Sequence, residues 1–411
     1  MKKQLLKTYL IKFLKMMFNL NILFKISLFV WLIFIPMKTS FYQISYALMI
    51  LLFLIYIFTN KKVTQFTKII YEQKTILIAF SFVILSMTIS NLLSPTSTYL
   101  SWKTEFYYVF RYLFIFLILL FFYKEKFFTK KNLIIVIFIS LLLQGVDGIF
   151  QAIFHYDFIK GNEGDLQVGL TGATFSRNTF GMFMALGASL SIGFILFKKQ
   201  FKLEKNDVFL LSIIFFIFIF NLMFSYSRAS WLFFVVFTFI LFLLNYKKIT
   251  KYQLLFLIFF LSISVMIFIS NQNLLMRFNS LLEGYSSHRF EIWSHTIDMI
   301  KQKLLFGNGL MTFSDIGKIG GKYYSGVHNS ILEILFFLGL FGFIAYANLI
   351  WKILKKIISN KSTIQIALFF AFLTITQFDQ SVIKGIASLS SLTVFSFFIF
   401  TQEQKNIMTL E

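Results

Sequence analysis

Long, uninterrupted apolar stretches restrict the fold of this chain more than any other feature. A helix needs about 20 mostly apolar residues to cross a bilayer. Twelve stretches of about that length lie near residues 19–36, 41–59, 75–94, 106–123, 132–153, 177–197, 208–226, 229–246, 252–270, 329–351, 363–379 and 383–401. They lack the alternation of a membrane β-barrel, and backbone groups in lipid must be satisfied within the segment. The sequence therefore predicts an all-α polytopic membrane protein with about twelve transmembrane helices.

The composition excludes other classes of protein. Of the 411 residues, 58% are hydrophobic and 14% are charged, whereas soluble domains carry about 25% charged residues. The chain has no cysteine, which excludes disulfide bonds and thiolate metal sites. A soluble globular fold is therefore not expected.

Positive charge is divided unevenly between the two alternating sets of loops. The net charge is +22, which in a soluble protein would suggest nucleic acid. Of the 39 Lys and Arg residues, 25 lie in the N-terminal segment, every second connection and the C-terminal tail, and 12 lie in the other connections. Because cytoplasmic loops carry the excess of Lys and Arg, both termini are predicted to be cytoplasmic, without a nucleic-acid partner.

Five segments follow from this topology. Residues 1–18 have leucines and lysines on opposite sides of a helix, as in amphipathic helices that lie on a membrane surface. Residues 19–270 hold the first nine predicted helices, and 271–328 form one large outer loop. The last three helices occupy 329–401, and a cytoplasmic tail covers 402–411.

Arginine is rare, and none of it lies in the predicted cytoplasmic loops. Arg111 falls within the fourth predicted span, and Arg177, Arg228, Arg277 and Arg289 lie at or beyond the outer boundary. A guanidinium is a planar, permanently charged donor that suits phosphate or carboxylate. The outer arginines are therefore candidate anion ligands, although such side chains also extend to lipid headgroups.

The large outer loop contains a predicted amphipathic helix that ends at Gly307. Its recurring apolar residues are Phe290, Trp293, Ile297, Ile300 and Leu304. Their spacing of three and four predicts a helix with its apolar face on the bundle or the bilayer. Residues 307–326 then hold six glycines, which is typical of a loop that closes over a substrate or of a passive surface hairpin.

The loop ends at His328, directly before the tenth predicted span. A histidine there can act as a general base or a neutral donor, or it can be an interfacial residue without chemistry. Asn329 or Ser330 is expected to cap the helix. Gly339 and Gly342 are small positions that allow a close helix approach.

Four segments resemble the O-antigen ligase superfamily. They are SRNTFGMFMAL (176–186), SYSRASWL (225–232), SSHRFEIW with LLFGNGLMTF (286–313) and HNSILEILFFLGLFG (328–342). The resemblance covers residues from about 176 to 342, and the first 150 residues match in span count only. One departure is that Ala229 and Ser230, rather than glycine, follow the serine–arginine pair.

The resemblance implies a GT-C-like fold and an inverting, metal-independent glycosyltransferase without a cofactor. Such proteins move a glycan from undecaprenyl diphosphate to an acceptor on the periplasmic face of the bacterial inner membrane. By resemblance, Arg228, Arg289 and His328 match the functional arginines and histidine of the family. The implied reaction is O-antigen ligation to the lipid A core in lipopolysaccharide biosynthesis.

Further substrate contacts are predicted for residues around the implied site and for one arginine inside a span. Arg177 and Asn329 lie beside the implied site, and Trp293 lies one turn after Arg289, where its ring could stack on the guanidinium. Arg111 is expected either to contact substrate or to pair with Asp147 inside the membrane.

The sequence has no Asp-x-Asp element of the kind that holds a metal in many glycosyltransferases. Glu163 and Asp165 are the only close acidic pair on the outer side. These two carboxylates either bind a metal ion or belong to a solvent-exposed loop.

Three alternative functions stay open. An O-antigen polymerase would use the same lipid-linked donor, and a protein O-oligosaccharyltransferase would use a different acceptor. A lipid-linked glycan flippase belongs to another class, and transporters are expected to contain internal repeats and broken spans at the midplane.

Overall fold

The computed structural model describes residues 19–401, apart from positions 38, 175, 283–287, 314–317, 320–321, 325, 379–385 and several of 252–268. Eight helical stretches in this part of the chain are long and apolar enough to cross a membrane, and each coincides with a predicted span. They are α3 (Ser40–Thr59), α5 (Lys74–Leu93), the continuous stretch of α6 (Tyr99–Tyr108), η1 (Val109–Phe114) and α7 (Ile115–Lys124), α8 (Lys130–Phe154), α9 (Arg177–Leu196), α10 (Lys205–Phe224), α11 (Arg228–Asn245) and α16 (Ser330–Asn360). The chain is therefore a multi-pass membrane protein.

Three further predicted spans correspond to shorter apolar helices. These are α2 (Leu20–Phe34), α17 (Thr363–Thr376) and α18 (Ile386–Phe400). The predicted span at 252–270 lies largely outside the described residues, as do the predicted segments 1–18 and 402–411. Eight of the twelve predicted spans thus have a helix of full span length.

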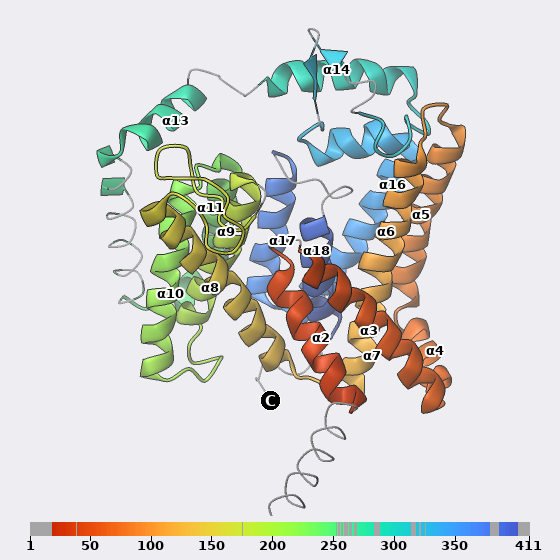
Figure 1. Cartoon of the computed structure of the whole chain (residues 1–411), viewed down its shortest axis with the longest axis horizontal. Coiled ribbons are helices and arrows are strands. Elements are labelled where there is room, and N and C mark those ends of the chain that lie inside the picture. The colour runs from red at the N-terminus through yellow and green to blue at the C-terminus, as the bar shows by residue number, and fades with distance from the viewer. Residues whose placement is uncertain are drawn as a thin grey trace, which may run out of the picture.

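The helices form one bundle. Helix α9 packs against α10 and α11, α11 against α17, α5 against α16, and α2 against α3. Figure 1 shows α8–α11 on one side, α5, α6 and α16 on the other, and α2, α17 and α18 between them. The core is rich in aromatic rings; Phe53, for example, meets Phe121 edge-on at 5.4 Å, an arrangement that aromatic pairs prefer.

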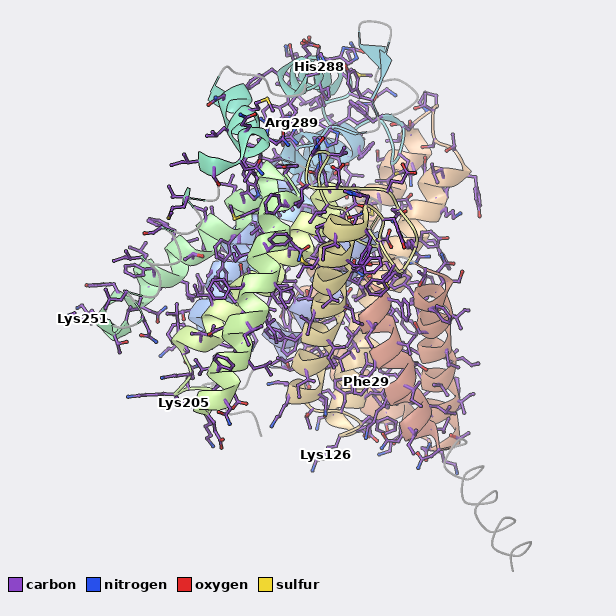
Figure 2. The ribbon with its side chains drawn as sticks, turned by 60° about the vertical axis from the view of Figure 1, so that its left-hand side comes forward. Phe29, Lys126, Lys205, Lys251, His288 and Arg289 are labelled. Atoms are coloured by element: carbon purple, nitrogen blue, oxygen red, sulfur yellow. The ribbon has the colours of Figure 1, made fainter. Side chains whose placement is uncertain are left out.

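Lysines of the predicted cytoplasmic loops and residues of the predicted outer loop lie at opposite ends of the bundle. Lys126 and Lys205, from predicted cytoplasmic loops, lie at the end opposite His288 and Arg289 (Figure 2). These two predicted cytoplasmic loops therefore share one end of the bundle, and the assignment of this lysine-rich end to the cytoplasm stays a prediction.

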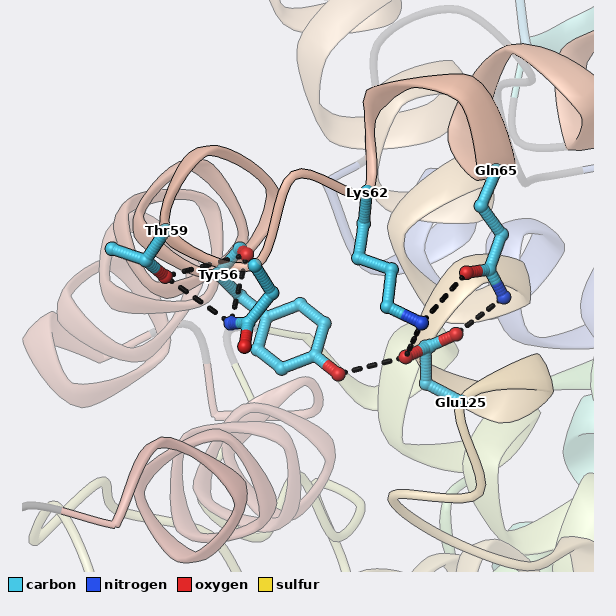
Figure 3. Close-up of polar contacts among 6 residues, drawn as sticks. Tyr56, Thr59, Lys62, Gln65 and Glu125 are labelled. Carbon is cyan, nitrogen blue, oxygen red and sulfur yellow. Dashed lines mark hydrogen bonds and ion pairs between the residues drawn. The ribbon is translucent and has the colours of Figure 1, made fainter.

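A polar cluster at the lysine-rich end holds a short helix that the sequence analysis treated as loop. This helix, α4 (Val63–Glu72), follows α3. The Glu125 carboxylate accepts hydrogen bonds from Tyr56 Oη at 2.7 Å and from Gln65, and it pairs with Lys62 at 3.3 Å (Figure 3). Because its partners come from α3, α4 and the turn between them, this carboxylate fixes α4 to the bundle.

Two helices cross the opposite end of the molecule. Helix α13 (Gln272–Leu282) is followed by α14 (Arg289–Gln302), which begins where the apolar spacing predicts a helix but ends five residues before Gly307. Its Ile292, Thr296 and Ile300 are buried. A short hairpin of β1 (Lys318–Ile319) and β2 (Lys322–Tyr323) follows.

Helix α16 is broken at Gly339, which corrects the prediction of one continuous tenth span. Gly339 has φ 65° and ψ −165°, a conformation essentially restricted to glycine. Figure 1 shows the short first part lying across the end of the molecule beneath α14, and the longer part running down the bundle.

The break is stabilised by backbone bonds to the segment after α14. Asn308 N and Gly309 N donate to the carbonyls of residues 336 and 337, at 2.8 and 3.1 Å. Leu340 N donates to Leu304 O at 2.9 Å, and Phe341 N to Leu305 O at 3.2 Å. Backbone groups that the interrupted helix would leave unsatisfied are therefore paired, and the first part of α16 is tied to the α14 segment.

We expect Gly339→Ala to destabilise the protein by about 3 kcal/mol or more, since residues in such conformations cost about 1–3 kcal/mol each and the new Cβ would also collide with backbone. The Cβ would lie 2.3 Å from Leu305 O. Thermal unfolding in detergent measures the effect. Gly193→Ala is the control, because its Cβ would make ordinary contacts with the side chains of Ile364 at 3.4 Å and Phe237 at 3.7 Å. Equal melting temperatures for the two variants would contradict the assignment.

Candidate active site

The N-termini of α9 and α11 lie side by side, and each begins with an arginine. Arg177 is the first residue of α9 and Arg228 the first of α11. A Cβ on Gly181 would lie within 3 Å of atoms of Ser225, Ser227 and Ser230. The structure therefore brings the predicted residues Arg177 and Arg228 to one region.

These arginines lie where a helix favours negative charge. The N-terminal end of a helix carries about half a positive charge, so a cation there costs about 0.3–1 kcal/mol. Free backbone N–H groups and guanidinium forks together suit a phosphate. The arrangement is unfavourable for the helices themselves and favourable for an anion.

A buried network of serines shapes the turn before Arg228. Ser227 Oγ and Ser230 Oγ lie 2.7 Å apart, and Ser227 N donates to Ser225 Oγ at 3.2 Å. Tyr226 adopts φ 52°, and its hydroxyl donates to Leu166 O. The sequence analysis missed the roles of these serines and of Tyr226; the run of small hydroxyl residues around Arg228 is the signal that could have found them.

The connection between α8 and α9 is folded against this turn. Leu170 N donates to Phe224 O at 2.8 Å. Gln151 Oε1 accepts from Thr171 N at 2.8 Å and from Gly172 N at 3.0 Å. Asp157 is fully buried and accepts from three backbone N–H groups of its own loop. The loop thus supports the arginine-bearing helix ends.

Arg289 occupies the equivalent position in α14, as its first residue. The preceding residue, His288, has φ 62° and lies with Nδ1 3.2 Å from Glu291 Oε2. Arg289 is partly buried. Three of the five arginines of the chain, Arg177, Arg228 and Arg289, therefore begin helices.

Trp293 ties α14 to the residue before His328. Its Nε1 donates to Val327 O at 3.1 Å, and its ring meets Phe290 edge-on at 5.7 Å. In the described part of the chain, the Trp293 ring does not stack on Arg289, so the predicted stacking was wrong. Trp293 is a positioning residue for the segment that carries His328.

We expect Trp293→Phe to reduce activity by up to about tenfold, because it removes one hydrogen bond worth about 0.5–1.5 kcal/mol and keeps an aromatic ring. Glycan transfer by membranes that contain equal amounts of protein gives the rate. Trp351→Phe is the matched control, since Trp351 is 52% exposed far along α16. If both variants transferred glycan equally, Trp293 would have no positioning role.

His328 is held above the end of α17. Asn329 caps α16, accepting from Leu332 N at 3.0 Å, as the sequence predicts. The Asn329 amide also donates to Gln377 O at 3.3 Å, and Ser330 Oγ donates to Thr376 O at 2.8 Å. His328 itself has φ 56° and is partly buried.

Helix α17 links this region to Arg228. It packs along α11, with the rings of Phe233 and Phe372 5.1 Å apart. Thr376, one turn after Phe372, therefore lies near the beginning of α11. The bond from Trp293 to Val327 joins Arg289 to the same region. Arg228, Arg289 and His328 thus stand on segments that contact one another at one end of the bundle.

Arg111 lies apart from this end, and its predicted pairing with Asp147 is wrong. Asp147 accepts instead from Phe158 N at 2.9 Å. Arg111 is on η1, with its guanidinium 3.8 Å from the ring centre of Tyr107 and 5.8 Å from that of Tyr46. The guanidinium contacts aromatic faces rather than a carboxylate.

Glu163 and Asp165 do not act as a pair. Asp165 Oδ1 accepts from Gln167 N and Val168 N, both at 2.7 Å. The backbone N–H of Val168, and to a lesser extent that of Gln167, holds the pKa of Asp165 below its usual value. Glu163 pairs through its backbone with Tyr156. Within the described part of the chain, no group of three or more His, Asp or Glu residues is placed to hold a metal ion.

Comparison with known families adds one match. Residues 213–347 match the family model described as O-antigen ligase, a segment that begins in α10 and ends in α16. It contains Arg228, Arg289 and His328. No curated protein matches the chain. Residues 213–347 are thus similar to the O-antigen ligase family, in agreement with the resemblance of the motifs at 225–232, 286–313 and 328–342.

Proposed function

We propose that the protein is an O-antigen ligase, within a family that covers ligases and polymerases. It transfers a glycan from undecaprenyl diphosphate to the lipid A core at the periplasmic face of the bacterial inner membrane. The observation that carries this proposal is the set of arginine-bearing helix N-termini at the end of the bundle that also holds His328. Such an end suits a lipid diphosphate, whose charge increases as the glycan leaves.

In this proposal, Arg228 and Arg289 bind the diphosphate, and Arg177 assists from the beginning of α9. An acceptor hydroxyl attacks the anomeric carbon from the face opposite the diphosphate, so the configuration inverts. The new bond joins the acceptor oxygen to that carbon, while the bond from the carbon to the phosphate oxygen breaks. Undecaprenyl diphosphate leaves with the bonding electrons, and guanidinium forks, rather than a metal, stabilise its charge.

His328 takes the acceptor proton or orients the hydroxyl. A base must lie within hydrogen-bond reach of the proton it removes, so the position of His328 matters as much as its pKa. Asn329 and Trp293 fix that position through the α16 cap and the bond to Val327. Asn329, partly buried beside His328, is proposed to contact the glycan as well.

Deletion of the gene followed by glycan analysis tests the proposal. A ligase mutant is expected to lose all polymer on lipid A and to accumulate lipid-linked polymer. A product with a single repeat on lipid A would instead identify the polymerase, and an unchanged lipopolysaccharide with altered glycoproteins would identify a protein O-oligosaccharyltransferase. Lipid-linked glycan retained on the cytoplasmic leaflet would identify a flippase.

A further inference from the structure

Arg111 is buried without a charged partner. It is 7% exposed, and its Nε and Nη1 atoms are buried without a hydrogen-bond partner. A guanidinium has five N–H donors. Its side-chain contacts in the described structure are the faces of Tyr107 and Tyr46.

Neither Glu105 nor Asp147 forms an ion pair with Arg111 in the described part of the chain. Glu105, on the preceding helix α6, is buried and accepts from Asn91 at 2.9 Å and from Thr88 at 2.5 Å. Asp147 holds the loop after α8. A buried charge without a partner is strongly unfavourable, and ionisable residues inside spans are usually paired or functional. Arg111 therefore lacks the counter-ion that its location requires.

The backbone around Arg111 is also unusual. Residues Val109–Phe114 form a π-helix within an otherwise α-helical span. Such segments are rare in proteins overall, but those that occur are often found at functional sites. Here the Arg111 carbonyl accepts from Thr393 Oγ1 at 3.4 Å, and Tyr112 Oη lies 2.9 Å from Ser396 Oγ. Helix α18 thus contacts the π-helix through the Arg111 carbonyl and the Tyr112 hydroxyl. The Arg111 guanidinium instead contacts Tyr107 and Tyr46.

The depth of Arg111 limits what could reach it. It lies thirteen residues before Lys124, the inner end of α7, and Tyr46 lies thirteen residues before Thr59, the inner end of α3. At about 1.5 Å per residue, both are about 20 Å from these ends. In a hydrocarbon core of about 30 Å, Arg111 is therefore about 10 Å inside the outer boundary.

The site borders the lipid. Tyr46 and Tyr107 are only partly buried. Phe106, directly before Tyr107, is 55% exposed, and Ile44, two residues before Tyr46, is 62% exposed, as expected for side chains that face the bilayer. An anion carried by a lipid could thus approach between α3 and α6 from the outer leaflet.

We propose that Arg111 is a second anion site, separate from Arg228 and Arg289, that binds the phosphate of a lipid entering between α3 and α6. The guanidinium supplies the donors, and the Tyr46 and Tyr107 rings hold it in place. The inference goes beyond the proposed transfer reaction and does not require it.

Native mass spectrometry of the full chain in zwitterionic nanodiscs tests this site. The variant is Arg111→Met, and the control is Lys103→Met, which removes a cation two turns away that lies 5.7 Å from the centre of the same Tyr107 ring. Added in turn are undecaprenyl diphosphate, phosphatidylglycerol and free inorganic pyrophosphate. We expect the wild type and Lys103→Met to retain one more phosphate lipid than Arg111→Met. The affinity of Arg111→Met at this site should be at least about tenfold weaker, as for the loss of one charge-assisted hydrogen bond.

The three additions identify the source of the phosphate. Retention of undecaprenyl diphosphate alone supports a carrier-lipid site, and retention of both lipids supports a general phospholipid site. Binding of free pyrophosphate as tightly as of either lipid would contradict a lipid-borne ligand. Arg289→Lys should keep the Arg111-dependent lipid, so failure of the transfer site and failure of this site give different results.

Thermal unfolding gives a second, independent outcome. Without an anionic lipid, Arg111→Met should unfold at the same temperature as the wild type or higher, because an uncompensated buried charge has been removed. A large loss of stability, or failure to fold, would mean that Arg111 is structural and would overturn the proposal.

Discussion

Arg228→Lys and Arg289→Lys are each expected to lower glycan transfer at least about 10²-fold, the usual loss when a donor to a developing charge is removed. Each arginine is the first residue of a helix, where the helix dipole disfavours a cation. Lysine keeps the charge but cannot supply two parallel N–H donors to a phosphate. The fold should tolerate the change, since both side chains are only partly buried.

Lipopolysaccharide ladders from a deletion strain that carries each variant measure this loss. Immunoblots of the membrane fraction must show wild-type amounts of protein. Lys301→Gln is the matched control: it removes a cation from α14, but Lys301 is 70% exposed and paired with Asp298, so the ladder should not change. A wild-type ladder from either arginine variant would refute the assignment of that residue.

His328→Asn is expected to abolish product while leaving the protein in the membrane. Asparagine is preferable to alanine here, because His328 has φ 56° and asparagine tolerates the left-handed conformation. The variant therefore removes the imidazole with little added backbone strain. Asn329 still caps α16 through Leu332 N, so the helix should begin at the same residue.

His288→Asn provides the comparison for His328→Asn. His288 has a similar φ of 62° and also precedes a helix, but its side chain is 50% exposed and paired with Glu291. We expect this variant to give a normal ladder. Equal loss of product in both variants would mean that the effect is not specific to the His328 imidazole.

Features that depend on neighbours in sequence were predictable. Continuous apolar stretches identified the spans, because a helix in lipid satisfies its own backbone. Periodic apolar residues identified α14, and Asn329 was one of two residues expected to cap α16, because a short polar side chain bonds the backbone N–H three residues later. The scarcity of arginine also pointed to Arg228 and Arg289, since lysine suffices for orientation in the membrane.

Features that depend on distant contacts were not predictable. The break of α16 at Gly339 exists because the backbone around Leu305 lies against it, and no local pattern contains that contact. Arg111 was expected to pair with Asp147 since charges inside membranes usually pair, yet a π-helix directs Arg111 toward two tyrosine rings. Trp293 has the spacing to stack on Arg289 but bonds Val327, which lies 34 residues away.

The sequence by itself determined the class of protein, the approximate positions of the spans and the residue types available for anion chemistry, because these follow from hydropathy and charge along the chain. The tertiary structure alone decided which of those residues stand together. Helix α17 connects Arg228 to His328, Trp293 connects Arg289 to the same end, and Arg111 is left without a carboxylate partner. Such outcomes arise from packing between segments far apart in sequence, where one backbone bond or ring contact selects among arrangements that local propensity cannot separate.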